Sequence, residues 1–369
     1  MYRPDTPPVT RIMEKLKMDV HFPAFRPHPW VRGGHLQTIL GCYFFHQTVP
    51  YTATRHQVML ADGDQIVVHD DRPQKWQPGD PVSLLVHGLG GSHQSGYMQR
   101  CAKKLNARGV RVFRMDLRGC GAGMGLAKQL CHAGRSSDVA AVLDDINLRC
   151  LHSPTAVIGF SMGANMVLKL AGEWGEDAPE NVVGVMAAAP PVDLGYCCRN
   201  VQKALRGIYD RSFVQGLRRY IAQRQRLCPN VSTPDLPKSV TRIQEFDAHI
   251  TAPLSGFADA EDYYAQASSG PYLTKIRIPT LIVAAKDDPI VPIAILQESK
   301  ISDAVKMVIA DGGGHLGYVG ARSLDPDCRW LDWRVVDWVL ARMPGPLVSS
   351  SWQIAGERIK TVPGVQHSV

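Results

Sequence analysis

Long apolar stretches are missing from this chain of 369 residues. No run approaches the ~18–20 apolar residues that a membrane-spanning helix needs. The segment from Met1 to Lys17 also lacks the apolar core of a signal peptide. We therefore expect a cytoplasmic protein without an integral membrane segment. Internal repeats and low-complexity tracts are absent as well, while an apolar content of 45% argues against wholesale disorder.

Local patterns that hold metals, nucleotides or disulfides are missing too. The nine cysteines are odd in number and form no close-set framework, so we expect reduced thiols. Cys197 and Cys198 are adjacent, and no Cys or His cluster has zinc spacing. The run Gly119-x-Gly121-x-Gly123-x-Gly125 lacks the Lys-Ser/Thr ending of a phosphate-binding loop. We expect neither a metal nor a cofactor, and no nucleic-acid partner.

Short β-rich runs alternate with longer helical ones. Val58–Leu60 and Ile66–His69, separated by a glycine turn, predict a hairpin. Val82–Val86 is apolar apart from Ser83, which is typical of a strand buried on both faces. This alternation predicts an α/β fold with a mostly parallel, eight-stranded sheet flanked by helices. The other expected strands are 110–115, 156–159, 182–188, 280–285 and 305–309, and the expected helices are 97–107, 138–149, 162–174 and 330–342.

Residues 195–272 interrupt that alternation. They hold no convincing buried strand, and their apolar residues recur at helical spacing. We interpret this segment as a helical cap inserted into one large α/β domain. The core would then comprise residues 56–194 and 273–343, with an N-terminal segment (1–55) packed on it and a peripheral tail (344–369).

A strand runs directly into Gly159-Phe160-Ser161-Met162-Gly163, and a helix-forming stretch follows at once. In that context Gly-x-Ser-x-Gly is typical of a nucleophile elbow, in which the serine projects from a strained turn. The helix N-terminus behind Ser161 favours developing negative charge. The pattern therefore predicts that Ser161 is a catalytic nucleophile.

A serine hydroxyl needs a histidine base, and that base needs a carboxylate to orient it. The chain order that accompanies such an elbow is serine, acid, histidine. Only His315 and His367 follow the last predicted strand, and His367 lies in the weakly patterned tail. We therefore assign the base to His315. Asp287 and Asp288 both follow the preceding strand, and the Asp-x-x-Val-Pro pattern favours Asp288.

An oxyanion hole needs two backbone N–H groups aimed at the tetrahedral oxygen. Met162 follows the nucleophile and supplies one, and Leu89 in His87-Gly88-Leu89-Gly90-Gly91 is expected to supply the other. We interpret His87 as stabilising that turn by a hydrogen bond. Asp116-Leu117-Arg118-Gly119 follows a strand, and we expect an ion pair there to tie its loop to the sheet.

These motifs together resemble the α/β-hydrolase superfamily, and more narrowly its YheT-like esterase branch (the AB hydrolase 4 family). That branch also includes plant embryogenesis-associated proteins and yeast ethyl ester synthases. Gly33-Gly34-His35-Leu36-Gln37-Thr38 is the part specific to the branch. The resemblance implies hydrolysis of short- to medium-chain or lipid esters by Ser161, His315 and Asp288 without a cofactor. The role of His35 and Gln37 stays open between buttressing the catalytic loops and ordering the N-terminal segment.

The sequence thus predicts a serine carboxylesterase that works through an acyl-enzyme on a small-molecule ester. Two alternatives stay open. One is transfer of the acyl group to an alcohol instead of water, and the other is a non-catalytic interaction protein that has inherited the triad. Since no catalytic position departs from the family pattern, the sequence offers no support for the second alternative.

The net charge of +7, from 41 basic and 34 acidic residues, is unevenly distributed. Between Tyr196 and Leu227 eight basic residues face Asp210 alone. One interpretation is a solvated basic helix face paired with acidic neighbours. The other is a cap that favours anionic substrates or peripheral contact with an anionic surface. The eight residues are Arg199, Lys203, Arg206, Arg211, Arg218, Arg219, Arg224 and Arg226.

Overall fold

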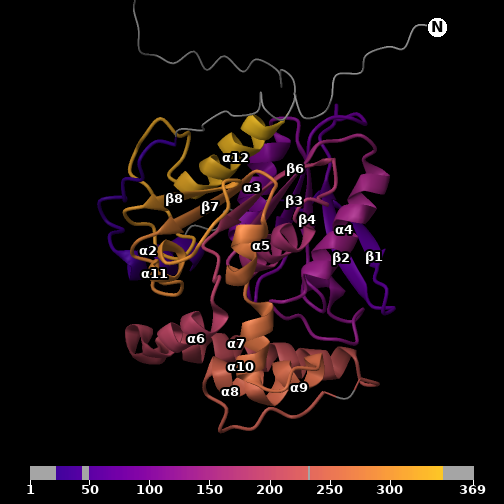
Figure 1. Cartoon of the computed structure of the whole chain (residues 1–369), viewed down its shortest axis with the longest axis vertical. Helices are drawn as coiled ribbons and strands as arrows, with labels where there is room; N and C mark the ends of the chain where they lie inside the picture. Colours follow the sequence, from indigo (N-terminus) through magenta and orange to yellow (C-terminus); the bar gives the residue numbers. More distant parts are fainter. Residues whose placement is uncertain (1–21, 44–49, 232, 344–369) are drawn as a thin grey trace, which may run out of the picture.

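Eight strands form a single sheet in the order β1-β2-β4-β3-β5-β6-β7-β8 (Figure 1). The computed structural model describes residues 22–43, 50–231 and 233–343. The predicted eight-stranded, mostly parallel sheet is confirmed: β1 and β2 form an antiparallel hairpin, β2 pairs antiparallel with β4, and the remaining pairs are parallel. The bounds are β1 Thr54–Met59, β2 Gln65–Asp71, β3 Val82–Val86, β4 Arg111–Met115, β5 Thr155–Phe160, β6 Val182–Ala188, β7 Thr280–Ala285 and β8 Val305–Ala310.

Helices cover both faces of this sheet. All residues of the central strands β3 and β5 are buried, which explains why their sequences are mostly apolar without alternation. Side chains of α3 and α12 share one buried cluster with one face, whereas α4 and α5 share another cluster with the opposite face. These helices are α3 Gly96–Asn106, α4 Ser136–Arg149, α5 Met162–Trp174 and α12 Trp330–Arg342.

The segment between β6 and β7, expected to form a helical cap, is helical throughout its regular elements. Figure 1 shows its helices gathered as a separate layer beyond one end of the sheet. A small apolar cluster that includes Val214, Ile221 and Phe246 gives this layer its own core. Its elements are α6 Leu194–Lys203, a 3₁₀ turn Ala204–Gly207, α7 Ile208–Leu227, α8 Ile243–Phe246, a π-helical turn Asp247–Thr251, α9 Ala252–Ser255, α10 Ala260–Ala267 and a 3₁₀ turn Gly270–Lys275.

The described residues before β1 include an aromatic side chain that packs on the core. Phe25 lies edge-on to Tyr318 and Trp330, with ring centroids 5.5 and 5.8 Å apart. Helix α2, Gly34–Tyr43, is formed by the Gly-Gly-His-x-Gln-Thr stretch, to which the sequence analysis assigned no element. The remaining short helices are a 3₁₀ turn at Gly121–Gly123 and α11, Ala294–Gln297. The tail at 344–369 lies outside the described residues.

Among the described residues, no helix combines the length and apolar character needed to cross a bilayer.

Candidate active site

Ser161 lies at a sharp turn between β5 and α5. Its φ of 52° is a left-handed conformation that a serine adopts only under strain. Neighbouring backbone leaves no room for larger residues: a Cβ on Gly159 would lie 2.5 Å from the Gly163 carbonyl oxygen, and one on Gly163 would lie 2.5 Å from that of His87. The glycines of the motif are therefore required by packing, and the turn projects the Ser161 hydroxyl away from the sheet.

His315 and Asp288 complete a hydrogen-bonded chain with this serine. Nε2 of His315 lies 2.9 Å from Oγ of Ser161, and its Nδ1 lies 2.9 Å from Oδ2 of Asp288. A carboxylate only accepts hydrogen bonds, so Nδ1 carries the proton and Nε2 is left as the acceptor for the serine hydroxyl. The structure thus brings together the three residues named from sequence, while His367 lies outside the described residues.

The two adjacent aspartates have different partners. Oδ1 of Asp288 accepts the N–H groups of Ile290 and Val291 at 2.8 and 2.9 Å, which fixes the carboxylate against His315. Asp287 instead accepts the N–H of Gly314 at 2.9 Å. Asp288 therefore faces the imidazole, and Asp287 holds the loop that carries it.

The loop after β3 passes close to the nucleophile. A Cβ on Gly88 would lie 2.9 Å from Cβ of Ser161, so Leu89 follows the point of closest approach. Met162 is the first residue of α5, where N–H groups have no partner within their own helix. Of the two residues expected to donate to an oxyanion, Met162 thus adjoins Ser161 in the chain, and Leu89 follows a glycine that packs against it.

His87 is completely buried at the start of that loop. Its Nε2 accepts the N–H of Leu117 at 3.1 Å, so its Nδ1 donates to the carbonyl of Gly88 at 2.8 Å. Burial lowers the pKa of His87 below its ordinary value, although the bond to Gly88 has the opposite effect. The lowered pKa keeps the ring neutral. These bonds fix the turn, as the sequence analysis interpreted them.

Helix α2 supports the histidine loop. The hydroxyl of Thr38 accepts the N–H of His315 at 2.8 Å and donates to the carbonyl of Gly34 at 2.6 Å. The contact between α2 and the loops is close, because a Cβ on Gly34 would lie 1.7 Å from the carbonyl oxygen of Asp287. Thr38 and Gly34 thus buttress the loops that carry His315 and Asp287.

Gln37 makes the same connection from a fully buried position. Its Oε1 accepts the N–H of Val319 at 2.7 Å, and its Nε2 donates to the carbonyls of Val31 and Val319 at 2.5 and 3.0 Å. His35, by contrast, contacts the helical segment between β6 and β7: its Nδ1 lies 3.0 Å from the hydroxyl of Tyr209 in α7.

We predict that Gln37→Leu lowers the free energy of unfolding by about 3 kcal/mol, because it leaves the buried N–H of Val319 and the carbonyl of Val31 without the partner that Gln37 provides. Urea unfolding followed by circular dichroism measures this change. Gln57→Leu, on the exposed side of β1, is the matched control and should shift stability by less than about 0.5 kcal/mol. Equal effects of the two substitutions would contradict the proposed role of Gln37.

Arg118 makes the ion pairs expected of its loop. Its guanidinium binds both carboxylate oxygens of Asp138, at 2.9 and 2.7 Å, and one of Asp64 at 2.7 Å. The side chain is almost fully buried, so these bonds tie the loop after β4 to α4 and to the turn between β1 and β2.

The basic residues of α6 and α7 divide into two groups. Arg224 is buried and donates to the carbonyls of Ala127 and Lys128, and Arg218 donates to three carbonyls that include that of Leu236. These two guanidinium groups therefore hold neighbouring loops by hydrogen bonds to backbone carbonyls.

Ion pairs between the other basic residues and acidic neighbours are sparse. Arg199 and Glu261, at 3.9 Å, form the one such ion pair among the described residues of 195–272. Exposed cations include Lys203, Arg206, Arg211, Arg219 and Arg226.

The structure also gathers three side chains that the sequence analysis did not connect. His69, His93 and Asp116 place potential metal-binding atoms within 4.8 Å of one another. They come from distant parts of the chain, so the local spacing used to search for metal sites could not find them.

Comparison with known proteins tests the predicted fold and the family resemblance. A family model for the alpha/beta hydrolase fold matches residues 81–321. "Putative esterase YheT" of Escherichia coli strain K12 is 33% identical over 309 residues, covering 83% of this chain and 89% of that protein. The chain belongs to the α/β-hydrolase fold family. The resemblance to the YheT-like branch, read from its motifs, is confirmed.

Other known proteins show weaker similarity. Embryogenesis-associated protein EMB8 of Picea glauca is 23% identical and covers 85% of this chain and 72% of its own length. The medium-chain fatty acid ethyl ester synthase/esterase 2 of Saccharomyces cerevisiae is 26% identical, covering 65% and 58%. Among solved structures, the Pyrococcus furiosus esterase Pf2001 has a TM-score of 0.52 at 16% identity, covering 82% of this chain and 98% of that one. At that identity the likeness concerns the fold alone.

Proposed function

We propose that this protein is a serine carboxylesterase that cleaves short- to medium-chain acyl esters, with lipid esters included, through an acyl-enzyme. The observation that carries the proposal is the continuous hydrogen-bonded chain from Ser161 through His315 to Asp288, with 2.9 Å at each step. The names of the YheT and yeast relatives, which contain the word esterase, point to the same chemistry.

The first half-reaction follows from that chain. Oγ of Ser161 attacks the carbonyl carbon while Nε2 of His315 takes its proton, and the N–H groups of Leu89 and Met162 hold the oxyanion. Asp288 keeps the proton on Nδ1 and stabilises the imidazolium. The carbonyl–alkoxide bond then breaks, and His315 returns its proton to the leaving alkoxide, which departs as the alcohol.

Deacylation reverses these roles with water. His315 takes a proton from the water, the hydroxide attacks the acyl carbon, and the bond to Oγ breaks. The proton on His315 returns to Oγ, so one ester and one water give one acid and one alcohol. An alcohol in place of water gives a new ester, and the yeast relative named as an ethyl ester synthase/esterase makes that alternative worth testing.

We further propose that the helices within 195–272 act as a cap over this site. Two contacts support this placement. Nδ2 of Asn200 in α6 donates to the carbonyl of Pro289 at 2.9 Å, next to Asp288. The rings of His35 in α2 and Tyr209 in α7 are stacked 5.7 Å apart. The exposed cations of this cap would then attract an anionic substrate or an anionic surface.

The experiment that tests the function is a panel of p-nitrophenyl esters from acetate to palmitate, together with monoacylglycerols. We expect turnover that is highest for short to medium acyl chains and covalent labelling by a fluorophosphonate, mapped to Ser161 by peptide mass spectrometry. Product analysis with added ethanol separates the two reactions, since an acyl transferase gives the ethyl ester and a hydrolase the free acid. A folded protein that takes no label and turns over no ester would leave the non-catalytic alternative.

A further inference from the structure

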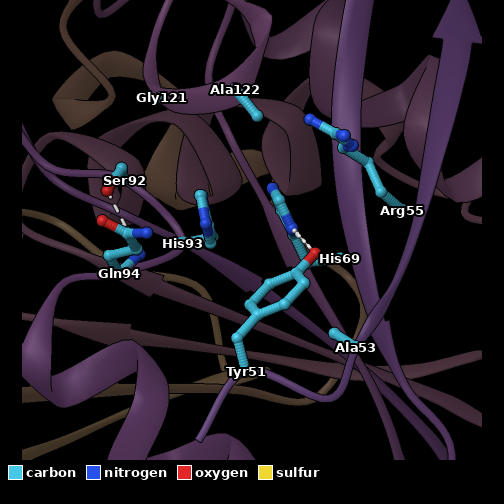
Figure 2. A pocket seen from close by; sticks show the side chains of 9 residues that line it. All are labelled: Tyr51, Ala53, Arg55, His69, Ser92, His93, Gln94, Gly121 and Ala122. Atoms are coloured by element: carbon cyan, nitrogen blue, oxygen red, sulfur yellow. Dashed lines mark hydrogen bonds between the residues drawn. The ribbon is translucent and has the colours of Figure 1, made fainter. Parts of the chain in front are cut away.

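Two histidines and an aspartate gather at a second place, away from Ser161. His69 lies on β2, His93 follows the loop that carries Leu89, and Asp116 comes directly after β4. All three side chains are buried, and Asp116 is completely so. Figure 2 shows the imidazoles of His69 and His93 side by side at the wall of a pocket, with Tyr51 beside His69.

The three groups meet at one carboxylate. Nε2 of His69 lies 3.0 Å and Nδ1 of His93 lies 2.9 Å from the same oxygen, Oδ2 of Asp116. The two rings are stacked with centroids 3.5 Å apart. Two ligands of a zinc ion, each about 2.0–2.2 Å from the metal, stand roughly 3–4 Å apart. The two nitrogen-to-oxygen separations lie at the short end of that range, and all three potential ligand atoms lie within 4.8 Å of one another.

We propose that His69, His93 and Asp116 bind one divalent transition-metal ion, with zinc the expected occupant. Two imidazole nitrogens and a carboxylate oxygen form a ligand set that suits zinc, whereas calcium and magnesium prefer oxygen ligands alone. The site is independent of the ester chemistry proposed above, so either can fail without the other.

Outer hydrogen bonds hold these ligands in place. The hydroxyl of Tyr51 lies 2.7 Å from Nδ1 of His69, the ring nitrogen that faces away from Asp116. Asp116 also accepts the backbone N–H groups of His93 and Ala122, at 2.6 and 2.8 Å. Metal-binding histidines and carboxylates are normally oriented by such second partners, which fix the tautomer and the ring direction.

A glycine allows the chain to wrap around the carboxylate. Gly121 has a φ of 52°, and a Cβ there would lie 2.3 Å from Oδ2 of Asp116. This explains one position of the glycine-rich run 119–125, to which the sequence analysis gave no function. The loop closes one side of the cluster and leaves the pocket as the path of entry.

The pocket gives an ion access and room for a further ligand. It has a volume of about 630 Å³, and polar side chains, among them Arg55, Ser92 and Gln94, form much of its wall. Three protein ligands with one side open to a polar pocket are the arrangement in which zinc keeps a water molecule or binds an anion. Arg55 lines the same pocket and adds a positive charge, which favours an anionic fourth ligand.

The test is zinc binding by the full-length, untagged chain after treatment with a chelator and buffer exchange. Isothermal titration calorimetry with zinc chloride should give about one site per chain with a Kd of about 1 µM or below. Cobalt(II) should give visible bands of a nitrogen- and oxygen-ligated ion without a sulfur-to-metal charge-transfer band, which excludes binding by the free cysteines.

His69→Gln should abolish this site, and Tyr51→Phe, which leaves all three ligands in place, should weaken zinc binding about 10- to 100-fold. His56→Gln is the matched control, since His56 faces the single carboxylate of Asp70 at 3.1 Å on the neighbouring strand, and should bind like the unaltered chain. If His69→Gln fails to fold, Tyr51→Phe decides. No binding by the unaltered chain, or equal binding by Tyr51→Phe and the unaltered chain, would overturn the proposal and leave a purely hydrogen-bonded cluster.

Discussion

Ser161→Ala is expected to lower kcat for p-nitrophenyl butyrate by about 10⁶-fold, the loss found when the nucleophile of a serine hydrolase is removed. The substitution deletes the only atom that can form the acyl-enzyme and leaves His315 without a proton to take. Since alanine keeps the Cβ and the backbone of the turn, folding should not change. Initial rates measured on purified protein, with far-ultraviolet circular dichroism as the test of folding, give the result.

A second serine provides the control. Ser83 is completely buried in β3, and its hydroxyl has no hydrogen-bond partner among the described residues. Ser83→Ala should therefore keep both the rate and the labelling by a fluorophosphonate, while Ser161→Ala loses both. Activity that survives in Ser161→Ala would mean that another group carries the reaction, and the acyl-enzyme mechanism would have to be abandoned.

Asp288→Asn is expected to lower kcat by about 10⁴-fold, as it does where a buried aspartate orients a catalytic histidine. An amide keeps the bonds from Ile290 and Val291 if its oxygen stays at the Oδ1 position. Its NH₂ group then faces Nδ1 of His315 and forces the proton onto Nε2. The imidazole is left in the tautomer that cannot accept the proton of Ser161. Rates measured at saturating substrate report this effect directly.

Asp287→Asn is the matched control, because Asp287 is the other candidate for the acid of the triad. Its amide oxygen can still accept the N–H of Gly314, so we expect a loss of no more than about tenfold. The reverse pattern, with Asp287→Asn inactive and Asp288→Asn active, would exchange the roles of the two aspartates.

The sheet and the site at Ser161 were predictable because their signals are local. A strand buried on both faces, such as Val82–Val86, needs a run of apolar residues. A nucleophile elbow needs Gly159 and Gly163 at fixed spacing from the serine, because a Cβ at either position would collide with backbone. Chain order then narrowed the candidates for the base to His315 and His367, and the candidates for the acid to Asp287 and Asp288.

What could not be predicted depends on contacts between distant parts of the chain. Nothing in the local sequence places Gln37 against Val319, or His69 beside His93, because each pair meets only after the sheet has formed. Helix α2 was missed for a related reason. Its start, Gly33-Gly34, is typical of a turn, and the packing of Gly34 against the Asp287 loop compensates for the poor helix propensity of glycine.

The bonds between α2 and the histidine loop also bear on how the enzyme is made. Gln37 and Val319 are separated by 282 positions in the chain, and Thr38 and His315 by 277. Contacts of such long range form late, since the entropy of closing the intervening chain must first be offset by other structure. During synthesis, α2 leaves the ribosome with its partner still to be translated. His315, the proposed catalytic base, therefore reaches its final position only when the two ends of the fold have met, and activity should be among the last properties that the folding chain acquires.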